Sequence, residues 1–204
     1  MSLTALPAIP NVQLIRYYHP QFVFLFLVSS SPDTMLLGLL SDSHGRHLMV
    51  RRAIELFADL GVEHIIHCGD VCGDHVFDEL AGRSLTFVWG NMDEVDAGLL
   101  AYLNVLGISA PNAVPTRLTL DDKRFAIFHG HEREFAQAER HAFSTLGVDY
   151  VLHGHTHVPR DDRLGRVRVI NPGALHRARP KSVATLDTTN DRLTRHEVKD
   201  NQAF

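Results

Sequence analysis

The stretch Leu36-Leu37-Gly38-Leu39-Leu40-Ser41-Asp42-Ser43-His44 joins an apolar run to a cluster of polar residues. The apolar run at 36–40 is typical of a strand that is buried on both faces in a parallel sheet. The two side chains that follow it, a carboxylate and an imidazole, are common metal ligands. We therefore predict a buried strand at 36–40 that carries Asp42 and His44 at its carboxyl end.

Strand and helix signals alternate after this stretch. An apolar stripe with helical spacing runs from Leu48 to Leu60, and Gly61 is a suitable residue to follow the end of a helix. A strand at 64–67, a short helix at 76–80 and a strand at 85–89 come next. This order, β-α-β-α-β, is the pattern of layered α/β folds with parallel strands.

The second half of the chain predicts a more mixed arrangement. A hairpin is expected around Asp121-Asp122-Lys123, with strands at 117–120 and 124–128. We predict a helix over 134–146 that ends at Gly147, and further strands at 150–152, 166–170, 182–186 and 193–198.

Length and composition limit the classes of protein to which the chain can belong. The chain has 204 residues, of which 45% are hydrophobic and 22% charged, enough for one buried core. The net charge of -4, without a basic tract, gives no nucleic-acid-binding patch. Cys68 and Cys72 lack the C-x-x-C spacing of a redox motif, so we expect free thiols in a cytoplasmic protein.

Residues 1–34 differ from the rest of the chain. The apolar run 22–28 is too short to span a bilayer, which needs about 20 residues, so we expect no membrane anchor. Secretion is the weaker alternative: Ser29-Ser30-Ser31 after the run fits a signal peptide, but the run only just reaches the length of a signal-peptide core, and a long, weakly charged segment precedes it. We predict that residues 1–34 are a dispensable extension, either the result of a mis-assigned start or disordered. Residues 35–204 are expected to form one domain.

Polar residues cluster where the predicted strands end. Carboxyl ends of parallel strands meet at one edge of a sheet, where sites are built, and burying so many ionisable groups without a cation would be costly. One such motif is weak evidence, but five together predict a metal site. The five groups are Asp42 with His44, Asp70, Asn91 with Asp93, His129 with His131, and His153-Gly154-His155-Thr156-His157.

The order of these motifs, D-x-H, GD, GN-x-D, HGH and GHTH, followed by Asn171-Pro172-Gly173, resembles the calcineurin-like metallophosphoesterase superfamily. It is most similar to the small single-domain bacterial and archaeal phosphodiesterases, over about Met35 to the C-terminus. The resemblance implies an α/β fold, a four-layer α/β/β/α sandwich of two mixed β-sheets flanked by helices. It also implies phosphodiester hydrolysis by water that two divalent cations activate.

The same resemblance implies a ligand for each cation position. Asp42, His44 and His157 would bind the first cation, Asn91, His129 and His155 the second, and Asp70 both. Every donor is nitrogen or oxygen and none is a thiolate, which suits Mn, Fe, Zn, Ni or Co rather than a structural zinc. Among these we expect Mn²⁺.

One position departs from the pattern of many family members. Met92 stands where they carry a histidine that stabilises the transition state or protonates the leaving group, a departure that the small phosphodiesterases share. The general acid is therefore open. His131 is a candidate acid or phosphate contact, or else a support for a ligand, and Asp93 would orient such a histidine or cap the next helix.

A second departure lies after Asn171-Pro172-Gly173. Ala174 stands where the family often has serine, so any contact from that hydroxyl is lost. Arg177 and Arg179 follow, and they would either clamp phosphate or remain solvated.

Two alternatives to a phosphodiesterase remain at this point. One is a phosphomonoesterase, and the other is a non-catalytic scaffold of the same fold, the role of a retromer subunit. For the leading reading the partner is a small phosphoester substrate. The sequence leaves the physiological substrate and the oligomeric state open, with a homodimer or a higher oligomer among the alternatives.

Overall fold

The computed structural model describes residues 12–19, 22–29 and 35–200. The chain divides into two units, Met1–Thr34 and Met35–Phe204. In the first unit, β1 (Val12–His19) and β2 (Phe22–Ser29) pair as antiparallel strands, which the sequence analysis did not predict. The prediction of a dispensable or disordered extension also concerns residues 1–11, 20–21 and 30–34, which lie outside the described residues.

The first sheet of the second unit has the strand order β12-β11-β3-β4-β5. Its centre is parallel, as the β-α-β-α-β pattern predicts, and β11 and β12 add antiparallel strands beyond β3. The strands are β3 (Leu36–Leu40), β4 (His64–His67), β5 (Leu85–Phe87), β11 (Ser182–Asp187) and β12 (Arg192–Glu197). The helices of this half are α1 (His47–Asp59), α2 (Asp74–Leu80) and α3 (Ala97–Val105).

The second sheet has the strand order β6-β7-β8-β10-β9. Its three inner strands are parallel, and β6 and β9 lie antiparallel at the two edges. The strands are β6 (Thr116–Leu120), β7 (Lys123–Ile127), β8 (Tyr150–Leu152), β9 (Arg160–Leu164) and β10 (Val167–Asn171). The helix α4 (Arg133–Arg140) and a 3₁₀ turn (Ser144–Leu146) belong to this half.

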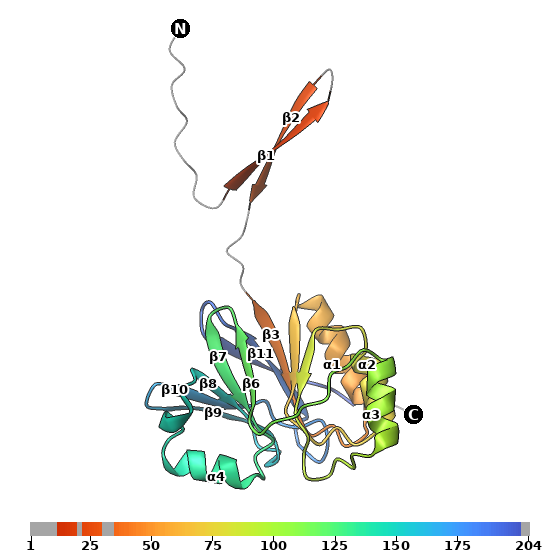
Figure 1. Ribbon diagram of the computed structural model, residues 1–204, viewed down its shortest axis with the longest axis vertical. Coiled ribbons are helices and arrows are strands. Elements are labelled where there is room, and N and C mark those ends of the chain that lie inside the picture. Colours follow the sequence, from red (N-terminus) through yellow and green to blue (C-terminus); the bar gives the residue numbers. More distant parts are fainter. Residues whose placement is uncertain (1–11, 20–21, 30–34, 201–204) are drawn as a thin grey trace. The chain divides into compact units, whose positions relative to one another are not determined.

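Three hydrophobic clusters define the layers. Leu37 and Leu39 of β3 point into a cluster with Phe125 and Ile127 of β7, so this cluster lies between the two sheets. Leu40, on the opposite face of β3, packs against the helices of the first half, as expected for the two-residue period of a strand. A third cluster joins α4 to the outer face of the second sheet. The predicted four-layer α/β/β/α sandwich is thus confirmed (Figure 1).

One predicted helix of the second unit is longer than the observed one. The helix expected over 134–146 ends at Arg140, because Ala142 and Phe143 adopt positive φ angles of 48° and 54°. That break buries Phe143 completely against Phe135, with ring centroids 5.3 Å apart, so burial of the ring prevails over helix propensity. The sequence analysis also missed α3 and the polar edge strand β9.

The helix α3 begins after Asp96, whose carboxylate accepts a hydrogen bond of 2.8 Å from Leu99 N. Asp96 is therefore the N-cap, and the expectation that Asp93 caps this helix is wrong. No helix in the described ranges has the length and apolar character needed to cross a bilayer.

Candidate metal centre

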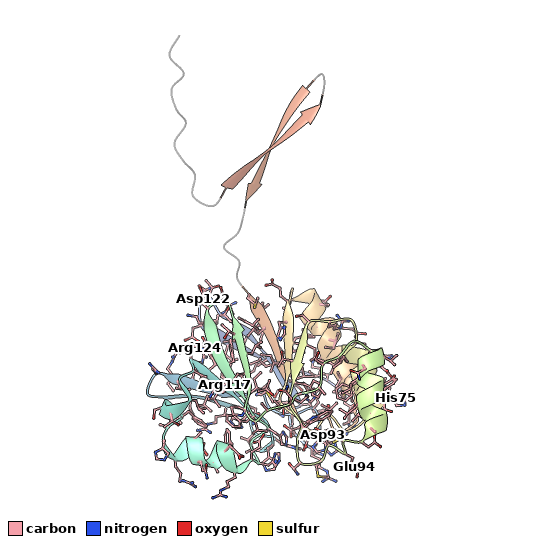
Figure 2. All side chains as sticks on the ribbon, in the orientation of Figure 1. His75, Asp93, Glu94, Arg117, Asp122 and Arg124 are labelled. Atoms are coloured by element: carbon pink, nitrogen blue, oxygen red, sulfur yellow. The ribbon has the colours of Figure 1, made fainter. Side chains whose placement is uncertain are left out.

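The predicted ligands converge at the carboxyl ends of β3, β4, β5, β7 and β8 because backbone hydrogen bonds tie the loops together. Asp42 N donates to Gly69 O (3.0 Å) and His44 N to Asp70 O (2.9 Å), which joins the loops after β3 and β4. Gly154 N donates to His129 O (2.8 Å), which joins the loops after β8 and β7. In Figure 2 the label of Asp93 shows where this edge lies, and Asp122 in the β6–β7 turn lies at the opposite edge.

Two buried carboxylates form the middle of the site. Asp70 Oδ2 lies 3.3 Å from His44 Nε2 and 3.3 Å from His129 Nε2. Asp42 Oδ1 lies 3.3 Å from His157 Nε2. Two groups of possible ligand atoms therefore fall within 4.8 Å of one another: Asp42, His44 and His157, and Asp42, Asp70 and His129. The first of these is the ligand set expected for the first cation.

Asn91 and His155 lie at the mouth of the site. Both are exposed, and both line a cavity of about 350 Å³ with His44, Asp70 and His157. The His155 ring lies 5.1 Å from that of His129, measured between centroids. Its backbone N–H donates to both oxygens of Asp42, at 3.1 and 3.2 Å, so this loop orients a buried carboxylate.

The backbone at the predicted ligands is strained. A left-handed conformation costs a residue other than glycine about 1 kcal/mol, and such residues gather at functional sites. Five of the seven predicted ligands have it: Asp42 (φ 52°), His44 (φ 44°), Asp70 (φ 55°), His155 (φ 66°) and His157 (φ 57°). The fold therefore holds these side chains against the local preference of the backbone.

The donor atoms fit a divalent cation. His129 Nδ1 donates to the carbonyl of Cys68 at 2.7 Å, so a neutral His129 presents the lone pair of Nε2 to Asp70. His129 Nε2 and His44 Nε2 are buried and have no hydrogen-bond partner among the described residues, which a cation between the carboxylates would supply. Cys72 Sγ belongs to neither group of closely spaced ligand atoms; it contacts His44 Nδ1 at 3.8 Å and Met92 O at 3.5 Å.

The pKa values of the predicted ligands are shifted from their usual values. Burial would raise the pKa of Asp70, but His129, the backbone N–H of Met92 (2.9 Å) and His44 outweigh it and hold that pKa at about 2. Burial lowers the pKa of His44 and of His155, which favours neutral imidazoles. Burial raises the pKa of Asp42. Burial would lower the pKa of His129, but Asp70, the Cys68 carbonyl and Asp42 outweigh it and raise that pKa. Metal binding would therefore displace a proton from His129, whereas His44 and His155 already favour the neutral form that binds a cation.

Two glycines make room for the carboxylates. A Cβ atom at position 90 would lie 2.0 Å from Asp70 Oδ1, and one at position 154 would lie 1.8 Å from Ser41 Oγ and 2.7 Å from Asp42 Oδ2. Only glycine allows the loops after β5 and β8 to approach the carboxylates this closely.

The two predicted catalytic residues lie in different surroundings. Asp93 accepts hydrogen bonds of 2.7 Å from Cys72 N and Gly90 N, so its carboxylate ties the loop after β4 to the loop after β5. The exposed His131 ring lies 5.4 Å from the His129 ring and 6.0 Å from the His155 ring, so it stands beside the predicted second set of ligands.

His176 is a residue of this site that the sequence analysis missed. Its ring lies 4.7 Å from that of His44 and 6.4 Å from that of His157, and its side chain lines the cavity. His153, which is also not assigned to a cation, is buried against Phe135, and burial lowers its pKa to about 4. No spacing rule marks position 176, and only the fold brings it to His44.

Residues 35–191 match the family model of the calcineurin-like phosphoesterase superfamily domain, so the chain belongs to this superfamily. The family is metal-dependent, and its members include phosphoric ester hydrolases. The phosphodiesterase MJ0936 of Methanocaldococcus jannaschii is 33% identical over 143 residues, which cover 68% of this chain and 83% of the relative. The phosphodiesterase YfcE of Escherichia coli K12 is 29% identical over 158 residues, which cover 69% and 79%.

Solved structures agree with the fold. An archaeal phosphodiesterase matches with a TM-score of 0.70 and 29% identity, over 80% of this chain and 99% of its own. Vps29 of Entamoeba histolytica, in complex with Zn²⁺, matches with a TM-score of 0.53 and 19% identity, over 81% of this chain and 100% of its own. At this lower identity the likeness extends to the fold alone. The family model and the relatives named phosphodiesterase support a phosphoric ester hydrolase.

Proposed function

We propose that this protein hydrolyses phosphodiesters, with two divalent cations bound between Asp42, Asp70 and the surrounding imidazoles. The observation that carries the proposal is the position of Asp70 Oδ2, at 3.3 Å from one imidazole of each expected ligand set, His44 and His129. A carboxylate in that position suits a ligand shared by two cations. When bound, the cations would supply an activated water and neutralise charge that develops at phosphorus.

The first cation would be held by Asp42, His44 and His157, and the second by Asn91, His129 and His155, with Asp70 common to both. The backbone N–H groups of His155 and Met92 hold Asp42 and Asp70 in place. Donors of this type favour Mn²⁺, with Fe, Zn, Ni or Co as alternatives.

The mouth of the site would receive the phosphoester. Because Met92 can neither donate a proton nor carry charge, another side chain must contact the phosphoryl or leaving-group oxygen. His131 is the proposed contact, since it stands beside His129 and His155 and is open to solvent. Asp93 would act indirectly, as the residue that keeps Gly90 and the Asn91 loop in position.

The test combines metal analysis with a substrate panel. Protein stripped with a chelator is assayed on bis(para-nitrophenyl) phosphate and para-nitrophenyl phosphate, with each cation restored in turn. We expect faster turnover of the diester, dependence on added cation, and loss of turnover in Asp70→Ala and His129→Ala. His75→Gln, at an exposed position on α2, is the matched control that keeps activity.

Each contrary result has a definite meaning. Faster turnover of the monoester would identify a phosphomonoesterase. Absence of turnover on every ester, together with a stable complex with another protein, would identify a scaffold. Full activity with chelator present, or in both alanine variants, would reject metal-dependent hydrolysis at this site.

A further inference from the structure

A cleft lined by basic side chains adjoins the metal centre, and we name it the basic cleft. It is lined by Arg46, Arg177, Ala178, Arg179 and Lys181. We propose that the basic cleft binds a second phosphate group of the substrate, so that the substrates are phosphoesters that carry a further phosphate. This proposal rests on the proposed function and specifies the substrate class.

The basic cleft and the catalytic cavity share a lining residue. It has a volume of about 550 Å³, and the cavity that contains His44, Asp70 and His157 has about 350 Å³. Arg177 lines both. A ligand whose phosphoester lies at the metal centre can therefore extend past Arg177 into the cleft.

The cleft carries more positive than negative charge. Asp200 is its neighbouring carboxylate, 3.5 Å from Arg46 Nη2 and 3.3 Å from Lys181 Nζ. Within the described part of the chain, neither Arg177 nor Arg179 has a carboxylate at ion-pair distance. Like charges gathered in one cleft repel one another, and an anionic group bound between them relieves that repulsion. Guanidinium groups also match the geometry of phosphate oxygens.

The loop that carries these arginines is anchored to the metal centre. Leu175 N donates to Ser41 O at 3.3 Å, next to Asp42, and residues 171–175 are buried. Arg177 has a positive φ of 48°, a conformation that costs a residue other than glycine about 1 kcal/mol. The anchored loop therefore holds the backbone of Arg177 in a fixed position beside the metal centre.

A second cavity that adjoins the catalytic cavity has the opposite charge. A cavity of about 570 Å³ adjoins it through Met92 and is lined by the carboxylates of Asp74, Glu94 and Asp96. These carboxylates would repel a second phosphate. The charge difference therefore orients a doubly phosphorylated substrate, with its second phosphate at Arg177 and Arg179.

The test uses two inhibitors that differ by one phosphate. Hydrolysis of bis(para-nitrophenyl) phosphate by the metal-loaded protein is inhibited with thymidine 5′-monophosphate and with thymidine 3′,5′-bisphosphate, and both affinities are also measured by calorimetry. We expect the bisphosphate to bind at least about tenfold more tightly than the monophosphate. Arg179→Gln should reduce this preference several-fold, and Arg83→Gln, an exposed arginine outside the basic cleft, should keep it.

Two results would overturn the proposal. One is equal affinity of the wild-type protein for the two nucleotides, and the other is an unchanged preference in Arg179→Gln. Failure of the proposed function gives a different result: no variant, nor the wild-type protein, hydrolyses bis(para-nitrophenyl) phosphate. The ratio of the two nucleotide affinities from calorimetry then still shows whether the cleft binds phosphate.

Discussion

The metal centre and the rim around it follow different physical rules. Asp42, Asp70 and His129 are at most 2% exposed and are held by glycine-lined loops. Met92 on the rim is 57% exposed, and His131 and Arg177 are exposed as well. Close packing allows the buried side chains of the centre a single arrangement, as a fixed metal site requires. The exposed side chains of the rim are not constrained in this way, so different residues fit there. A substitution should therefore reduce turnover most at the centre and least at the rim.

The largest effect is expected for Asp42→Asn. Asp42 belongs to both groups of closely spaced ligand atoms, so its loss of charge removes a ligand of the first cation and a carboxylate beside the ligands of the second. We expect turnover of bis(para-nitrophenyl) phosphate to fall by about 10³-fold or more, with a lower metal content by atomic spectroscopy. Near-normal metal content and turnover in this variant would show that the centre does not depend on Asp42.

Gly90→Ala tests whether the packing of the centre matters as much as its ligands. The added Cβ would lie 2.0 Å from Asp70 Oδ1, so the carboxylate or the loop must move. We expect about 10²-fold lower turnover and a loss of roughly 1–3 kcal/mol of unfolding free energy in urea titrations.

Gly82→Ala is the matched control for Gly90→Ala. Gly82 has a φ of 71° and open space around its Cβ position, so it tests backbone strain without a clash. We expect a stability loss of about 1 kcal/mol and unchanged turnover. Equal losses of activity in the two variants would remove the argument that Gly90 serves Asp70.

Buried imidazoles outside the ligand set should make stability depend on pH. Burial lowers the pKa of His153 from 6.5 to about 4, so between these values the unfolded chain binds a proton that the folded protein does not. The stability of the chelator-treated protein therefore falls as pH falls from 7 to 5, by roughly 2 kcal/mol for this one group. His153→Gln should reduce the difference between urea titrations at the two pH values, and an unchanged difference would assign it to other groups.

The sequence predicted the centre better than the rim, for a physical reason. The strand at 36–40 is a continuous apolar run, and the strand at 64–67 has two isoleucines between histidines; the bounds of both agree with the structure, and the ligands follow where the strands end. Because neighbouring strands of a sheet end at the same edge, residues that are far apart in the sequence but follow strand ends come together in space. The helix expected over 134–146 failed because a tertiary contact of Phe143, absent from any local pattern, ends it early.

The rim depends on contacts between distant parts of the chain. His176 reaches His44 across 132 residues of sequence, and the basic cleft combines Arg46 with Arg177, Arg179 and Lys181. Neither arrangement forms a basic tract or a spaced motif, so the sequence analysis left Arg177 and Arg179 between phosphate binding and simple solvation. The acidic cavity near Met92 was hidden in the same way, because it joins Asp74 to Glu94 and Asp96.

The smallest effect should come from the rim residue His131. Its ring is close to those of His129 and His155 but belongs to neither group of closely spaced ligand atoms. If it contacts the phosphoryl group, His131→Gln should lower kcat by about tenfold, the effect of one lost hydrogen bond to a charged group, and leave the metal content unchanged. If it only supports His129 or His155, metal content and kcat should fall together. Measurement of both quantities on one preparation, with His75→Gln as the control, therefore decides whether chemistry extends from the buried centre to its rim.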